Sequence, residues 1–231
     1  MKNKVLKFYD SLKKFDNHRY KSWEHCHSFF VRIKDEKLSE DKLNLAQLHL
    51  AFYLASWGMY RGSSFILQKD YTIFSKIVKT ILDQKYSLLW NIEKNLDKKE
   101  KLIELFVDIY EKIENELKIV KKSIKQHPDL ENSEKRYLSE RKNISYTLMT
   151  KILLGTIGCI PAYDRFFIDG LNKTDIQKKF SAKKSFRQLL KFYEENEKEI
   201  NILTKECKGY TPMKIIDMYF WIIGYNNFSE K

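Results

Sequence analysis

The chain has 231 residues, of which 43% are hydrophobic and 14% aromatic, so it has enough apolar material for a packed core. Only seven Gly and three Pro are present, which argues against a fold rich in strands and tight turns. Abundant Lys, Leu and Ile with few helix breakers predict an all-α, compact multi-helix protein. The net charge of +12 indicates a partner rich in phosphate, unless the lysines only solvate helix faces.

The cysteines and the hydropathy pattern predict where the protein works. Cys26, Cys159 and Cys207 are scattered, which is typical of reduced thiols in the cytosol. No stretch approaches the roughly 20 apolar residues that span a bilayer, and the charged N-terminus does not resemble a signal peptide. We therefore expect a soluble, cytoplasmic protein with no membrane partner. His25 and His27 are two positions apart and do not share a helix face, so we expect neither a metal nor another cofactor.

Apolar residues recur at helical spacing through the first half of the chain. The predicted helices cover residues 3–15, 20–33, 39–57, 70–82, 86–96 and 98–125. Ser39 and Asp70 are the expected N-caps of the third and fourth helices. The third helix is apolar on most sides, so we expect it to be central and buried. The sixth is long and amphipathic, and it ends before Pro128.

The second half of the chain has the same helical pattern. The predicted helices cover residues 144–157, 163–171, 181–204 and 211–223. Ser181 is an expected N-cap, Gly209 an expected helix stop, and Pro212 the first residue of the last helix. No repeat or long linker interrupts the chain, so we expect one helical domain covering residues 1–231. Two lobes, at about residues 1–130 and 131–231 with a cleft between them, fit the same pattern.

The positive charge is concentrated in residues 141–192, which contain eleven Lys and Arg against three Asp and Glu. Such a basic stretch is typical of a surface that binds the phosphates of a nucleic acid. Arg61 also follows an apolar helix and is suited to a phosphate contact. The candidate phosphate-binding residues are Arg61, Lys142, Arg165, Lys173, Lys183 and Lys184.

One carboxylate, Asp164, lies within this basic stretch, just after Pro161 and at the start of a predicted helix. An acidic side chain at that position can interact with free backbone N–H groups and with the helix dipole, so a helix cap is one interpretation. The other interpretation is chemical, because a carboxylate near a sugar stabilises the positive charge that develops when a glycosidic bond breaks.

Residues 150–167 resemble the segment that follows the hairpin in the helix-hairpin-helix DNA glycosylases. The matching residues are Ile152, Leu153, Leu154, Gly155, Pro161, Asp164 and Phe167, within about 20 residues of the chain. The resemblance implies a DNA-glycosylase-like fold in which a Pro-containing turn places Asp164 at a helix N-terminus. There it faces a nucleotide that is flipped out of double-stranded DNA.

The same resemblance implies roles for the neighbouring residues. Asp164 is the catalytic carboxylate, and Lys151 is a second candidate because some members of the family use a Lys as nucleophile. Lys151 lies inside the helix, later than the hairpin Lys of those members, and residues 132–146 contain no Gly. A monofunctional enzyme that uses water therefore fits better. The candidate base-pocket residues are Trp57, Tyr60, Tyr163 and Phe166, with Trp221 as a further aromatic.

We therefore expect a DNA glycosylase-like enzyme that hydrolyses the N-glycosidic bond of a damaged or modified base, in repair or in defence against phage. Two alternatives stay open. One is a non-enzymatic, basic, helical nucleic-acid-binding protein in which Asp164 only caps its helix. The other is a helical protein-interaction module that uses the amphipathic helix at residues 98–125.

Overall fold

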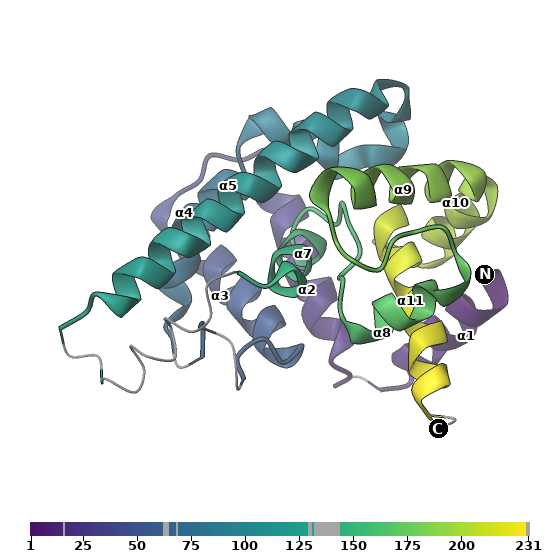
Figure 1. The fold of residues 1–231 in the computed structure, drawn as a ribbon, viewed down its shortest axis with the longest axis horizontal. Coiled ribbons are helices and arrows are strands. Elements are labelled where there is room, and N and C mark those ends of the chain that lie inside the picture. The colour runs from purple at the N-terminus through teal and green to yellow at the C-terminus, as the bar shows by residue number, and fades with distance from the viewer. Residues whose placement is uncertain (16, 62–64, 68, 129–130, 132–143, 230–231) are drawn as a thin grey trace.

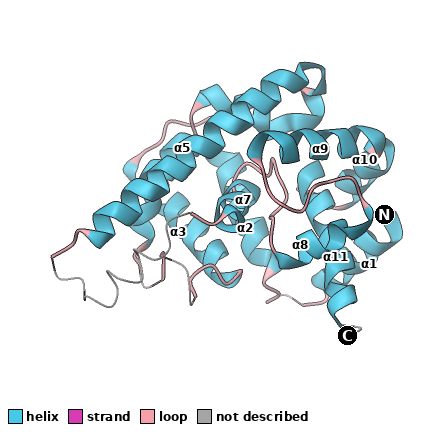
Figure 2. Cartoon of the chain, in the orientation of Figure 1, coloured by secondary structure: helices cyan, strands magenta, loops and turns pink. Residues whose placement is uncertain are grey.

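The computed structural model describes residues 1–15, 17–61, 65–67, 69–128, 131 and 144–229 (Figure 1). Within these ranges every regular element is a helix and no strand is present (Figure 2). The all-α prediction is confirmed. None of the helices in these ranges is both long and apolar enough to span a membrane.

The α-helices follow the predicted order closely. They are α1 (Lys2–Lys13), α2 (Tyr20–Ile33), α3 (Glu40–Ser56), α4 (Ser75–Ile81), α5 (Lys99–Lys125), α7 (Tyr146–Gly155), α8 (Arg165–Gly170), α9 (Ala182–Glu195), α10 (Glu197–Glu206) and α11 (Pro212–Ser229). Within the described residues, 3₁₀ helices cover Tyr71–Phe74, Gln84–Lys94 with a non-helical break at Asn91, Leu96–Lys98 and Leu171–Lys173.

Side-chain caps explain several of the helix starts. Ser39 accepts a hydrogen bond from the backbone N–H of Lys42 at 3.3 Å, and Asp70 accepts one from Thr72 at 2.9 Å, as predicted. Ser181 precedes α9 but makes no capping bond with its side chain. The helix predicted to reach residue 204 is interrupted at Asn196, where α9 ends and α10 begins.

The central helix is α7, whose residues from Leu148 to Gly155 are all buried; it lies in the middle of the fold in Figure 1. The expectation that α3 is central and buried is wrong for one of its faces. Leu45, Leu48 and Phe52 are exposed to 47%, 41% and 62%, although they are apolar. These positions follow one helix face, and α2, α4 and α7 pack against the rest of α3. Composition alone does not show which apolar face of a helix packs against other helices.

One continuous hydrophobic core includes residues from both halves of the chain. The N-terminal α1 packs against α10 and α11, and α5 packs against α9. A stacked pair joins the latter two helices, because the rings of Phe106 and Phe186 lie 4.1 Å apart. The core therefore does not divide near residue 130. Residues from both sides of that point line one shared cleft.

Helices α8 and α11 pack backbone against backbone through two glycines. A Cβ atom added to Gly170 would lie 2.0 Å from the carbonyl oxygen of Phe220, and one added to Gly224 would lie 1.9 Å from that of Phe166. Neither neighbour is a flexible side chain, so neither can easily move aside. The glycines therefore fix the distance between α11 and the short helix that follows Asp164.

Side chains from α2 form hydrogen bonds with backbone carbonyl groups in the turn after α7. The indole N–H of Trp23 donates to the carbonyl of Leu154 at 2.9 Å, and His27 Nδ1 lies 2.7 Å from the carbonyl oxygen of Thr156. Gly158 has a φ of +73°, and its N–H donates to the carbonyl of Leu153 at 2.8 Å. The carbonyls left free at a helix C-terminus thus gain partners, which makes the turn a defined structure.

Gly224→Ala is expected to destabilise the fold by about 1–3 kcal/mol, because the added methyl group would collide with the backbone of Phe166. Urea denaturation followed by circular dichroism measures the loss. Asn226→Ala, at an exposed position of the same helix, is the control and should change the stability by less than about 0.5 kcal/mol. Equal effects of the two substitutions would contradict the close packing of α8 and α11.

The stability is expected to fall in acid partly because of His27. Burial lowers the pKa of His27 from 6.5 to about 4, so the folded chain keeps the ring neutral while the unfolded chain takes up a proton. Stability is therefore lost as the pH falls from about 6.5 to about 4, by up to about 3 kcal/mol. Denaturation at several pH values should show a flatter profile for His27→Gln, and an unchanged profile would refute this assignment.

Candidate functional site

A cleft of about 590 Å³ is lined by the C-terminal end of α3, by α7, by the start of α8 and by α11. This volume lies within the roughly 300–1,000 Å³ that is common for small-molecule sites. The charged residues that line it are Arg19, Arg61, Lys151, Asp164 and Arg165, and the aromatic ones are Trp57, Phe166 and Trp221. The cleft thus combines a carboxylate, four cationic side chains and three aromatic rings.

The cleft brings together two segments that the sequence singled out independently. One segment ends α3 and carries Trp57 and Arg61, and the other carries Lys151, Asp164 and Phe166. More than a hundred positions separate Arg61 from Asp164 along the chain. Their meeting in one cleft depends on the packing of α3 against α7.

Asp164 uses its two carboxylate oxygens differently. Oδ1 accepts a hydrogen bond from the backbone N–H of Phe167 at 3.1 Å, so the residue is the N-cap of α8. Oδ2 accepts one from Nζ of Lys151 at 3.1 Å. The side chain is 18% exposed and lines the cleft. The cap geometry is therefore present, and it leaves the second oxygen directed to the cation.

Lys151 is a charged residue on the central, buried helix α7, and its side chain is only 5% exposed. Burial of a lone ammonium group is costly, so the group needs partners. Asp164 supplies the counter-charge, and the ring of Trp57 lies beneath Nζ with its centroid 4.9 Å away. The carboxylate, the ammonium group and the indole form one connected cluster.

A second ion pair, fully buried, holds the turn that leads to Asp164. Lys214 and Asp217 lie 2.8 Å apart in α11, and their side chains are 1% and 7% exposed. The other oxygen of Asp217 accepts a hydrogen bond from the backbone N–H of Ala162 at 2.9 Å. Nζ of Lys214 also lies over the rings of Tyr20 and Trp23, at 4.8 and 5.0 Å. The ion pair thus anchors the backbone two residues before Asp164.

Sequence reasoning missed this pair, although a signal was present. Lys214 and Asp217 are the only charged residues of α11, and they lie one turn apart in a largely apolar helix. Such spacing lets the two side chains meet. Arg19 was missed as well, because it precedes α2 in a segment with no other signal.

Arg19 belongs to the cleft through its aromatic contacts. Its guanidinium group lies 4.7 Å from the ring centroid of Trp57 and 5.7 Å from that of Trp221. A cation over an indole face is electrostatically favourable. Arg19 therefore joins a tryptophan at the end of α3 to one in α11.

Two predicted pocket residues do not line the cleft. Tyr163 is fully buried and packs against Phe167 and Phe180, with ring centroids 4.9 and 4.8 Å away. The backbone at Asp164 is extended, and neighbouring side chains of an extended chain point in opposite directions. Tyr60 also lies outside the cleft lining, and burial together with Asp70 raises the pKa of its hydroxyl to about 12.

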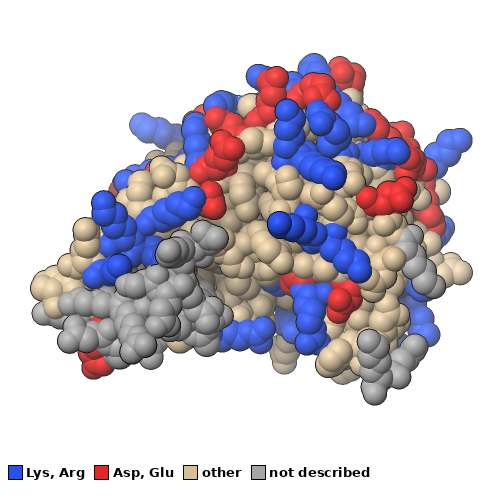
Figure 3. Space-filling model, in the orientation of Figure 1, with Lys and Arg blue, Asp and Glu red and all other residues tan. Residues whose placement is uncertain are grey.

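The predicted phosphate-binding lysines are less concentrated than the sequence implied. Lys183 and Lys184 are exposed in the first turn of α9 and do not line the cleft. Lys142 lies outside the described residues, and the side chain of Lys173 is not described. On the face drawn in Figure 3, basic side chains are spread over several helices with acidic ones among them. The arginines of the cleft are therefore the better-placed cations.

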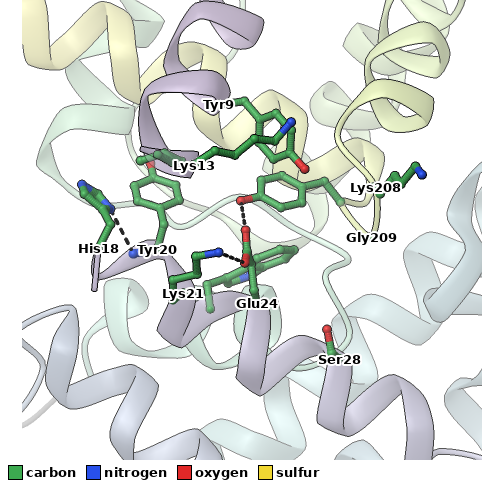
Figure 4. Close-up of a pocket in the computed structure, with 12 residues that line it drawn as sticks. Tyr9, Lys13, His18, Tyr20, Lys21, Glu24, Ser28, Lys208 and Gly209 are labelled. Carbon is green, nitrogen blue, oxygen red and sulfur yellow. Dashed lines mark hydrogen bonds and ion pairs between the residues drawn. The ribbon is translucent and has the colours of Figure 1, made fainter. Parts of the chain in front are cut away.

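A second, smaller cavity of about 230 Å³ lies between α1, α2 and the segment before α11. Figure 4 shows Glu24 inside it, where it accepts a hydrogen bond from the hydroxyl of Tyr210 at 2.8 Å and pairs with Lys21 at 3.7 Å. Tyr20 separates the two cavities, since it lines this one and its ring packs edge-on against Trp57. No predicted site residue lines the smaller cavity.

The chain matches no protein-family model, and no curated protein or solved structure is significantly similar to it. The resemblance around Asp164 therefore stays a prediction. Among the described residues, no three His, Cys, Asp or Glu side chains are grouped so that they could hold a metal ion.

Asp217→Asn is expected to destabilise the protein by about 3–5 kcal/mol, because it leaves the buried ammonium group of Lys214 without a counter-charge. Denaturation in urea measures the change. The double variant Lys214→Met with Asp217→Asn removes both charges and should lose less stability than Asp217→Asn alone. If the destabilisations of Lys214→Met and Asp217→Asn, measured separately, add up to that of the double variant, the two side chains are not energetically coupled.

Proposed function

We propose that the protein is a DNA glycosylase-like enzyme that hydrolyses the N-glycosidic bond of a modified base in double-stranded DNA. The observation that carries the proposal is the position of Asp164, whose carboxylate lines a cleft rich in cations and aromatic rings. A capping carboxylate does not by itself require such surroundings. A site that breaks a glycosidic bond in DNA requires all three groups. The carboxylate stabilises charge on the sugar, the cations bind phosphates, and the aromatic rings contact the flipped base.

The arginines provide the proposed contacts to DNA. Arg61 and Arg165 are exposed at the cleft, so their guanidinium groups are accessible to phosphates next to the target nucleotide. Guanidinium groups bind phosphate oxygens through paired, charge-assisted hydrogen bonds. The base itself has left the stack and enters the cleft, where the volume of about 590 Å³ accommodates it.

Asp164 provides the proposed chemistry. As the bond between C1′ and the base nitrogen breaks, positive charge develops on the sugar ring, and Oδ2 stabilises it. The oxygen of a water molecule then bonds to C1′ and keeps one proton as the hydroxyl group of the abasic site, while the other proton of that water passes to the leaving base nitrogen. The products are the free base and an abasic site. Phe167 N–H and Lys151 hold the two oxygens in place beforehand.

Lys151 is assigned the role of partner to the carboxylate in this scheme. Its ammonium group is buried, paired with Asp164 and covered by Trp57, which restrains its movement toward a substrate. Water is therefore the proposed nucleophile, and strand cleavage is not part of the reaction. The alternative function, nucleic-acid binding without chemistry, is favoured by the capping hydrogen bond from Phe167.

Asp164→Asn is expected to reduce base release by on the order of 100-fold or more while leaving DNA binding unchanged or tighter. The amide still caps α8 but does not carry the charge that stabilises the sugar. Because Asp164→Asn also leaves the buried Lys151 without its counter-charge, urea denaturation checks that the variant is folded under the assay conditions. Duplex oligonucleotides, each with one modified base, serve as substrates. Alkaline cleavage of abasic sites and mass spectrometry of the released bases measure the activity, and filter binding at low salt measures affinity.

Asp175→Asn is the matched control, because it makes the same change at an exposed position outside the cleft, and it should keep full activity. Strands treated with the natural protein should break only after alkali. Full activity of Asp164→Asn would show that Asp164 serves only as the N-cap of α8. Binding without base release from any duplex would favour the non-enzymatic alternative, and absence of binding at low salt would favour the interaction module.

A further inference from the structure

The aromatic rings of the cleft are already occupied by cations of the chain itself. Arg19 lies 4.7 Å from the ring centroid of Trp57, and Lys151 lies 4.9 Å from it. Arg19 also lies 5.7 Å from the ring of Trp221. Arg165 lies 4.8 Å from the ring of Phe166. Each of the three aromatic residues that line the cleft therefore has a positive charge over its ring.

This arrangement determines what the rings can offer a ligand. An indole or phenyl face attracts a cation because of its negative quadrupole, and a site for a positively charged base depends on a face that is free for it. Trp221 is restricted further, because Tyr225 stacks on it at 5.0 Å with an interplanar angle of 10°. A cationic base would therefore gain little from these rings.

The charge balance of the cleft also disfavours a cationic base. Four cationic side chains line it against one carboxylate, and that carboxylate is engaged by Lys151 at 3.1 Å. A ligand with its own positive charge would be repelled by these cationic side chains. A ligand that offers oxygen acceptors would meet the guanidinium donors of Arg19, Arg61 and Arg165.

We infer that the cleft selects an uncharged base rich in carbonyl oxygens, as produced by deamination or oxidation, and rejects N-alkylated, positively charged purines. This inference rests on the proposed glycosylase function and names its substrate class. Arg19 is the specificity-determining residue, since it occupies two of the three rings and presents donors to the same space. The chemistry works against this preference, because a cationic purine leaves its sugar more readily than a neutral one.

Base release from a matched set of duplexes tests the inference. The neutral probes contain a single uracil, hypoxanthine or 8-oxoguanine, and the cationic probe contains a single 7-methylguanine. Release of at least one neutral base is expected to exceed release of 7-methylguanine by on the order of 100-fold, after subtraction of the spontaneous loss. Because 7-methylguanine is the better leaving group, such a ratio reports recognition rather than reactivity.

Arg19→Gln is the variant that tests the residue. Release of the neutral base should fall about 10-fold or more, and the ratio to 7-methylguanine should shrink, because a guanidinium donor and its charge are lost. Lys21→Gln removes the same charge two positions away, in the smaller cavity, and should behave like the natural protein. Urea denaturation of both variants shows whether each is folded.

The outcomes separate the inference from the proposed function. Equal or preferential release of 7-methylguanine would overturn the inference and leave the glycosylase function standing. An unchanged ratio in a folded Arg19→Gln would remove Arg19 as the specificity-determining residue. Release of no base from any duplex would overturn the proposed function and, with it, the inference.

Discussion

The buried salt bridge between Lys214 and Asp217 is the interaction on which the candidate site depends. It places two charges in the core, and it is stable because each is satisfied: Lys214 by the carboxylate and two aromatic rings, and Asp217 by the ammonium group and the N–H of Ala162. That last hydrogen bond holds the backbone two residues before Asp164. Since a buried charge without its partner is strongly unfavourable, the position of the turn is linked to the stability of the whole core.

Side chains from two helices, α2 and α11, therefore hold the segment between α7 and Asp164. Trp23 and His27 of α2 bind the carbonyls at the end of α7, and Asp217 of α11 binds Ala162. The close approach of α8 to α11 through Gly224 fixes the helix that Asp164 caps. A carboxylate held in this way needs little rearrangement to meet a developing charge, which is the property that the proposed hydrolysis uses.

Much of the fold could be predicted from the sequence because the signals are local. Helical spacing of apolar residues gave the order of the helices, and capping at Ser39 and Asp70 follows from chemistry within three residues. The cap at Asp164 is local in the same sense. The burial of Tyr163 and the exposure of Leu45 could not be predicted, because each depends on which remote element covers that side of the backbone.

By itself, the sequence determined an all-helical chain with a basic surplus and a carboxylate at the start of a helix after a Pro turn. Only the tertiary structure decided that Asp164 faces Lys151 and that Trp57 and Arg19 share its cleft. The physical reason is the range of the interactions. Helix formation and capping involve residues a few positions apart, whereas the cleft forms only when α2, α3, α7 and α11 pack around a shared core.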